Sequence, residues 1–251
     1  MSSLEVSSIA FVCVFGGSLL GLALRTVLPE HHRSAETKDA VKVGMSLVAT
    51  MAALVLGLLV ASAKSAYDQQ RNEMTDLSSK IALLDRVLAH YGTETKEARD
   101  LLRNVATRIL DQTWSKDSTG HSRLESPAAG GEVLYDKVQA LTPRDETERS
   151  LKAQALTILL GIGQTRWLMY EQTTEPISVP LLIVLILWLT TVFISFGLLA
   201  PANLTVTASY FAAALAVASA ILLIMEMYSP YVGLLHISSA TLRAAIAQLG
   251  R

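Results

Sequence analysis

The residues of this chain that could do chemistry are few and far apart. His31 and His32 are adjacent, so on a helix they would point in different directions, and no third ligand is fixed nearby. We interpret them as residues of an interfacial loop rather than as a metal site. The sequence has no phosphate loop, dinucleotide fingerprint, HExxH motif or nucleophile elbow. The pattern therefore predicts no catalytic residue, no metal site and no cofactor.

One acidic residue, Glu226, lies at the edge of a long uncharged run. An ionisable side chain within a membrane span is a functional hypothesis by default. Because Glu226 is near the end of its run, the simpler interpretation is that its carboxylate reaches toward water. Both interpretations stay open at this point.

The run 43–63 carries the most informative spacing. Small, weakly polar side chains recur every three or four residues, so they share one face of a helix. Such a stripe lets helices pack closely, which is the commoner use, or it lines a narrow pore. If the helix is rotated, leucines of the adjoining face form the constriction instead. The spacing runs through Ser46, Thr50, Ala53, Gly57, Ala61 and Lys64, of which the first five are the pore-lining candidates, and the alternative residues are Leu54 and Leu58.

The stripe makes one substitution prediction for a member, Gly57, and one for a neighbour, Leu56. We expect Gly57→Leu to abolish activity or assembly, because a branched side chain there clashes with a helix or plugs a pore. We expect Leu56 to face lipid, so that Leu56→Ala is mild. Simple packing faces are predicted elsewhere, at Gly17 and Gly21 of the first run and at Ala212, Ala216 and Ser219 of the fourth.

Four uncharged runs are long enough to cross a bilayer, which takes about 20 apolar residues of helix. They cover residues 6–24, 43–63, 179–199 and 204–227, where Glu226 near the end of the last run is the one charge, and the turn sequence Ala200-Pro201-Ala202-Asn203 separates the last two. None alternates polar and apolar residues as a barrel strand would. The predicted fold class is therefore all-α: an integral membrane helical bundle of four transmembrane helices, with a helical soluble insert between the second and third.

The charged residues are concentrated in the insert. Residues 64–175 hold 15 basic and 17 acidic residues, and the rest of the chain holds 6 and 5. We divide the chain into transmembrane helices 1 and 2 (1–63), the insert (64–175), transmembrane helices 3 and 4 (176–228) and a C-terminal amphipathic segment (229–251). The net charge of −1 gives no basic field that would favour nucleic acid.

Helical spacing organises the insert. One apolar seam continues from the second span without Gly or Pro, and it predicts either packing within the chain or a coiled coil between subunits. Gly92 ends this helix, and Thr93 or Thr95 is expected to cap the next one. Further helices are expected around 101–109, 133–141 and 145–171, with a loop at 115–131. The seam consists of Leu77, Ile81, Leu84, Leu88 and Tyr91.

Five segments together resemble a known family. They read LPEHH at 28–32, VATMAALVLG at 48–57, LDRVLAHYG at 84–92, QTRW at 164–167 and SPYVG at 229–233. The chain is similar over nearly its whole length to the bacterial membrane proteins labelled bestrophin-like, a family whose function is not established. It is similar only distantly to true bestrophins, which are pentameric anion channels with cytoplasmic termini and a second span that lines the pore.

The resemblance implies a homo-oligomer in the lipid bilayer of the inner (plasma) membrane, with both termini and the insert in the cytoplasm. Two features of true bestrophins are missing: the row of phenylalanines in the second span and the acidic cluster of the calcium clasp. Calcium gating is therefore not carried over, and these departures weaken the case for anion selectivity.

Three hypotheses remain. The first is an oligomeric ion channel whose second span lines the pore and passes a small ion. The second is a non-conducting scaffold or sensor whose insert binds a partner. The third, a membrane enzyme, has the least support, because no nucleophile, base and orienting group cluster together.

Overall fold

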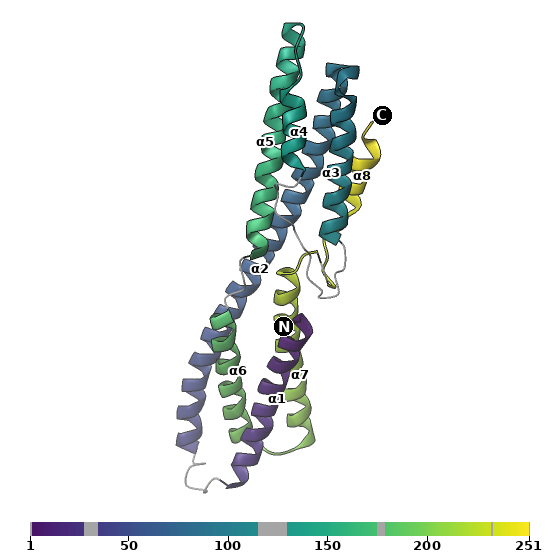
Figure 1. Cartoon of the computed structure of the whole chain (residues 1–251). Helices are drawn as coiled ribbons and strands as arrows, with labels where there is room; N and C mark the ends of the chain where they lie inside the picture. Colours follow the sequence, from purple (N-terminus) through teal and green to yellow (C-terminus); the bar gives the residue numbers. More distant parts are fainter. Residues whose placement is uncertain (1, 28–34, 115–129, 175–178, 232, 251) are drawn as a thin grey trace. The chain divides into compact units, whose positions relative to one another are not determined.

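The computed structural model describes the chain except for residues 1, 28–34, 115–129, 175–178, 232 and 251. Every regular element among the described residues is helical (Figure 1). The helices are α1 (Ser3–Val27), α2 (Ala35–Tyr91), η2 (Thr93–Thr95), α3 (Lys96–Trp114), α4 (Gly131–Gln139), α5 (Glu146–Thr174), α6 (Val179–Leu199), α7 (Leu204–Met227) and α8 (Ala240–Gln248). His31, His32 and nearly all of the predicted loop 115–131 fall outside the described residues.

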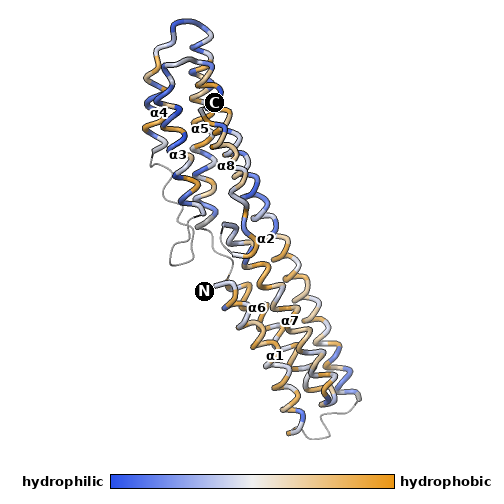
Figure 2. Tube along the Cα trace, turned by 90° about the vertical axis from the view of Figure 1, so that its right-hand side faces the viewer, coloured by the Kyte–Doolittle hydropathy of each residue, from blue (hydrophilic) through white to orange (hydrophobic). Residues whose placement is uncertain are grey.

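Four helices, α1, α2, α6 and α7, are long and apolar enough to cross a membrane, judged by length and composition. Figure 2 shows hydrophobic residues along α1, α6, α7 and the first part of α2, and mixed colours over α3, α4 and α5. The predicted all-helical class with four helices of membrane-spanning length is confirmed. The bounds of α6 and α7 coincide with the predicted runs, because a proline turn separates them and Asn203 caps α7 by accepting the Val206 N–H at 2.8 Å.

The chain forms two compact units. Unit 1 contains Met1–Ala66 and Ile177–Tyr228, and unit 2 contains Tyr67–Pro176 and Ser229–Arg251. Helix α2 passes through both as one helix of 57 residues, as the lack of Gly and Pro after Lys64 predicted. Unit 2 includes α8 together with the insert helices.

Helix α2 ends at Tyr91, just before Gly92, whose φ of +133° favours glycine. The predicted cap was assigned to the wrong helix end. The Thr95 hydroxyl donates to the carbonyls of Leu88, at 2.6 Å, and Gly92, at 2.7 Å. It therefore satisfies acceptors at the end of α2 instead of donors at the start of α3, because the 3-10 turn η2 separates the two helices.

In unit 1, α1 packs against α6 and α7. The closest approach is at Gly21 and Gly197, where an added Cβ on either glycine would run into the backbone of the other helix. Gly17 also faces α6, so the predicted packing face of the first span is confirmed. The prediction for the fourth span is wrong within the chain: Ala212, Ala216 and Ser219 are exposed, because the neighbouring face, with Ala214 and Ala218, packs inward.

In unit 2, the predicted seam of α2 forms the core with α3, α4, α5 and residues after α7. All five seam residues are buried within the chain, which supports intrachain packing over a coiled coil through this face. Helix α3 contributes Leu102, Ala106 and Ile109, and α5 contributes Ala155, Leu159 and Ile162. The short helix α4, which begins at Gly131 instead of 133, covers them with Leu134 and Val138.

Candidate functional site

Helix α2 has two distinct faces within unit 1. Its inward face packs through Ala52, Leu59 and Ala63 against Leu185 of α6 and Ile224 of α7. These five residues are nearly inaccessible, with at most 5% of their surface exposed. This contact fixes the rotation of α2 about its axis, and so it decides which side chains point away from the chain.

The outward face of α2 consists of the residues that the spacing singled out. All seven are exposed in a single copy of the chain: Ser46, Thr50, Ala53, Leu54, Gly57, Leu58 and Ala61. Leu54 and Leu58 are 70% and 66% exposed, and a Cβ added to Gly57 would meet nothing within 4 Å. The small stripe therefore packs against no other helix of its own chain.

Leu56 was expected to face lipid, and this prediction is wrong. It is half-buried and packs against the cluster of Leu59 and Leu185. The reason is its position: successive residues lie about 100° apart around a helix, which turns Leu56 away from the Gly57 stripe and toward α6. Truncating Leu56 removes an internal contact.

The two hydroxyls of the outward face have a defined orientation. Ser46 Oγ donates to the carbonyl of Lys42 at 2.7 Å, and Thr50 Oγ1 donates to the carbonyl of Ser46 at 2.8 Å. Because each proton is held by the backbone of the preceding turn, the oxygen lone pairs remain for a partner outside the helix. This face presents oxygen acceptors to its surroundings and, from 43 to 63, no charge.

Glu226 lies in the last turn of α7 and is 6% exposed. The residue has an interaction within the structure, so it is not free. Close by in the sequence, Tyr228 is within 3.3 Å of Ser62 on α2, Oη to Oγ. The burial of Glu226 does not fit a carboxylate that reaches toward water.

Unit 2 holds a buried ion pair between α2 and α3. Asp85 is 2% exposed and accepts from Arg99 at 2.7 and 2.9 Å, one bond to each carboxylate oxygen. The N–H of Gly250 donates to the same carboxylate at 3.1 Å. Burial alone raises the pKa of Asp85, but the hydrogen bonds from Arg99 and Gly250 outweigh it and hold the pKa below its usual value.

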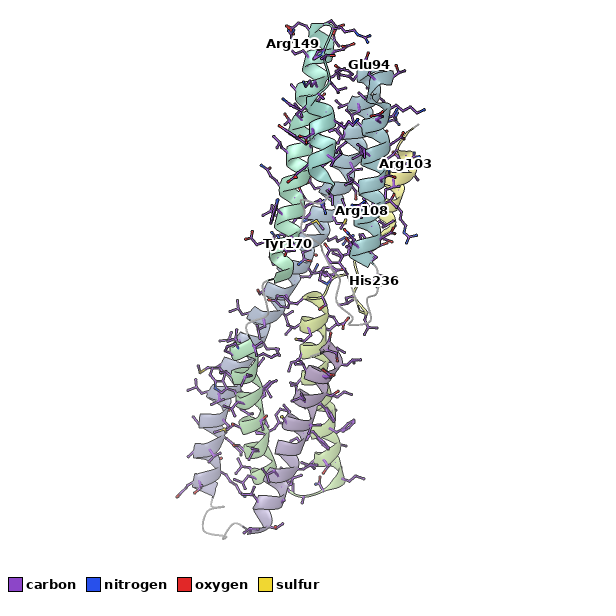
Figure 3. All side chains as sticks on the ribbon, viewed as in Figure 1. Glu94, Arg103, Arg108, Arg149, Tyr170 and His236 are labelled. Carbon is purple, nitrogen blue, oxygen red and sulfur yellow. The ribbon has the colours of Figure 1, made fainter. Side chains whose placement is uncertain are left out.

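The residues after α8 are held on the same surface. Arg103 of α3 donates to the carbonyl of Leu249, a residue that is 1% exposed (Figure 3). Leu242 of α8 is also fully buried, against the core of unit 2. The sequence suggested only an amphipathic segment here. Asp85, the α3 residues Arg99 and Arg103, and Gly250 come from three separate segments of the chain, and no local spacing indicated that they meet.

An apolar cavity of about 430 Å³ lies in unit 2 between α3, α4 and α5. Its lining includes Leu102, Ile109, Leu134 and Leu159, and the charged residues of the lining are Glu132, Asp136 and Arg166. The size and the apolar walls suit a small-molecule or peptide side-chain pocket. Among the described residues, three or more His, Cys, Asp or Glu side chains nowhere gather as metal ligands.

A family model described as a bestrophin-like domain matches residues 12–242 of the sequence. The chain belongs to the bestrophin-like family. The structure agrees in fold with two variants of a bacterial bestrophin homologue from Klebsiella pneumoniae, one with an isoleucine-to-threonine and one with a tyrosine-to-alanine substitution.

The first variant has a TM-score of 0.66 at 13% identity, with 96% of each chain covered. The second has a TM-score of 0.61 at 13% identity and covers 94% of this chain and 97% of its own. At this identity the likeness shows that the bestrophin-like chain shares their fold. No curated protein matches the sequence. The resemblance found from the five sequence segments is confirmed at the level of the family.

Proposed function

We propose that this bestrophin-like protein is the subunit of an oligomeric ion channel in the inner membrane, with the outward face of α2 lining the pore. The observation that carries the proposal is the exposure of all seven candidate residues on one side of α2, while its other side packs on α6 and α7. True bestrophins, which the chain resembles distantly, conduct ions along their second span, and the bestrophin-like family match covers α2.

A pore along α2 requires more than one copy of the chain. A single α2 cannot enclose a pore, because it lines only one side of it. The stripe has no partner helix within its own chain. A ring of copies, a pentamer by the bestrophin resemblance, would place the small residues around a common axis and leave α1, α6 and α7 to contact lipid. Pore width and the lining atoms then set which ions pass.

The hydroxyl orientation at Ser46 and Thr50 favours cations as the conducted ions. Oxygen lone pairs are the groups that replace the hydration shell of a cation in a selectivity filter, whereas an anion needs donors. The donors of both hydroxyls are committed to backbone carbonyls. We expect sodium or potassium to carry most of the flux in reconstituted vesicles, with chloride carrying little.

The decisive experiment replaces Gly57 by leucine. Gly44→Leu is the matched control, because Gly44 is also an open glycine of α2 but lies about 140° from Gly57 around the helix. Both variants are purified, their oligomer mass is measured, and cation flux into liposomes is recorded. We expect Gly57→Leu to assemble and conduct nothing, and Gly44→Leu to conduct as the natural protein does.

Other outcomes discriminate between the hypotheses. If Gly57→Leu falls apart into single chains, the stripe is a packing surface between copies and the pore proposal loses its main support. If it assembles and conducts normally, neither interpretation of the stripe holds.

The scaffold hypothesis has one observation in its favour, the apolar cavity of unit 2. Under that hypothesis the natural protein conducts no ion in vesicles, whereas filling the cavity with Ala106→Trp removes binding of the partner. If the natural protein conducts ions in vesicles, the channel hypothesis is supported and the scaffold hypothesis is rejected.

A further inference from the structure

Five side-chain oxygens in unit 2 are buried and make no hydrogen bond within the part of the chain that the structure describes. One of them, Tyr91 Oη, belongs to the last residue of α2, and the other four are considered together. Buried polar atoms are nearly always paired with protein or with an ordered ligand, so each exception calls for an explanation. Three of the four side chains are more than nine-tenths buried, and Glu73 is half-buried with one oxygen enclosed. The atoms are Gln70 Oε1, Glu73 Oε2, Thr113 Oγ1 and Tyr231 Oη.

The four residues come from segments that meet at one end of the unit 2 core. Gln70 and Glu73 lie about one turn apart on α2, and Thr113 lies in the last turn of α3. Tyr231 follows α7, and its ring meets the ring of Trp114, the neighbour of Thr113, at 5.7 Å in an edge-to-face contact. Burial raises the pKa of Tyr231, and the negative charge of Glu73 raises it further, so the phenol lies within the field of that carboxylate.

Only one oxygen of the Glu73 carboxylate accepts hydrogen bonds. Oε1 accepts from Nε2 of Gln172, at 2.6 Å, and from Nε2 of Gln69, at 3.1 Å. Both donors are neutral amides, and none of the ion pairs among the described residues involves Glu73. Its second oxygen therefore points into the core as an acceptor without a donor or a counter-charge.

We propose that these four oxygens form a binding site for a small monovalent cation, sodium or potassium. Oxygen ligands suit hard cations, and Thr113 and Tyr231 can turn their protons aside to present lone pairs. The charge count selects a monovalent ion: one carboxylate is neutralised by one positive charge, whereas calcium sites commonly supply several carboxylates. The site is separate from the α2 pore face and does not depend on the channel proposal.

The test compares salts on the purified full-length protein. Thermal stability is measured in sodium, potassium and N-methyl-D-glucamine chloride at equal ionic strength and pH. A ligand that binds only the folded state raises Tm as its concentration rises. We expect sodium or potassium to raise Tm above the organic cation, which is too large to enter the site.

Variants locate the effect. Glu73→Gln and Tyr231→Phe each remove a proposed ligand, and we expect the alkali concentration for half of the Tm increment to rise roughly tenfold or more. Asp111→Asn removes an exposed carboxylate of the nearby last turns of α3, and it should keep the increment. Thr50→Val, on the pore face, should also keep it, which separates this site from ions held in the pore.

Three results would overturn the proposal. The first is equal Tm in alkali and organic salts for the natural protein, as expected if water alone fills the space. The second is an alkali increment that survives in both Glu73→Gln and Tyr231→Phe. The third is an increment that Thr50→Val abolishes, which would assign it to the pore. If Glu73→Gln does not fold, Tyr231→Phe and a direct count of bound sodium by flame emission decide between these outcomes.

Discussion

At the scale of single residues, the crossing of α1 and α6 depends on glycine. The Cβ of an alanine at Gly21 would lie 2.9 Å from the amide nitrogen of Leu198 and still closer to the carbonyl oxygen of Ile194. Backbone atoms cannot move aside as a side chain can. The two helices would have to separate, and the contacts along their whole interface would weaken.

We therefore predict that Gly21→Val destabilises the folded protein by about 3 kcal/mol or prevents its assembly. Gly16→Ala is the control, since its added Cβ meets nothing within 4 Å and alanine favours helix over glycine by about 1 kcal/mol. Thermal unfolding in detergent measures both. A Gly21→Val protein as stable as the natural one would mean that α1 and α6 do not cross at this point.

The ion pair of Asp85 and Arg99 makes a second residue-scale prediction. Removing one partner of a buried pair leaves the other charge uncompensated. We therefore expect Asp85→Asn to lower the free energy of unfolding by about 3 kcal/mol at pH 7. The folded-state pKa of Asp85 is lowered, so the pair stabilises the protein fully above the usual aspartate pKa of about 4. That stabilisation is lost as the pH falls through the lowered folded-state pKa.

The measurement is urea unfolding from pH 7 down to pH 3, for the natural protein and Asp85→Asn. The difference in unfolding free energy should be constant near neutral pH and shrink below about pH 4. Asp136→Asn, an exposed carboxylate of α4, should show little difference at any pH. If the difference in unfolding free energy between the natural protein and Asp85→Asn stays constant down to pH 3, the ionised Asp85 does not stabilise the fold as proposed.

At the scale of elements, α2 has different surroundings along its length. Its residues in unit 1 pack on one side only, whereas its residues in unit 2 face α3, α5 and Tyr231. Polar contacts lie beside the apolar seam. Lys80 Nζ forms an ion pair with Asp76 Oδ2 at 2.7 Å and donates a hydrogen bond to Thr165 Oγ1 of α5 at 3.0 Å. The seam determines how the insert folds.

We predict that Leu77→Ala destabilises unit 2 by about 3 kcal/mol, because it opens a cavity at a position with no exposed surface. Leu83→Ala, six residues later on the same helix, should change stability by less than about 0.5 kcal/mol, since Leu83 is 50% exposed. Hydrogen exchange of α3 and α5 amides reports the loss. Equal effects of the two truncations would show that the seam is not the core.

At the scale of the whole molecule, four spans place both termini and the insert on the same side of the membrane. We predict that reporters fused after Arg251 and within residues 115–131 give cytoplasmic signals, and that a reporter within 29–40 gives the opposite signal. Charge alone does not settle which side is inside, because basic residues flank the spans on both sides. Disagreement between the first two fusions would remove the four-span arrangement.

Much of this protein follows from the sequence alone. Uncharged runs of about 20 residues predict spans, since a helix is the one local structure that satisfies its own backbone in lipid. The spacing of Leu77, Ile81 and Leu84 likewise defined a seam that the structure buries. Gly17 and Gly21 indicated a close helix crossing. These features are local, so a short stretch of sequence contains the whole signal.

The tertiary structure decided what depends on partners far away in the chain. Periodicity gives the faces of α2 but not the face that meets α6, so Leu56 was assigned to lipid although it packs inward. For the same reason, the inward face of α7 was placed at Ala212 and Ala216 instead of Ala214 and Ala218. The cation site proposed from Glu73, Thr113 and Tyr231 likewise depends on how α2, α3 and the segment after α7 pack together. No local spacing records contacts between segments so far apart in the chain.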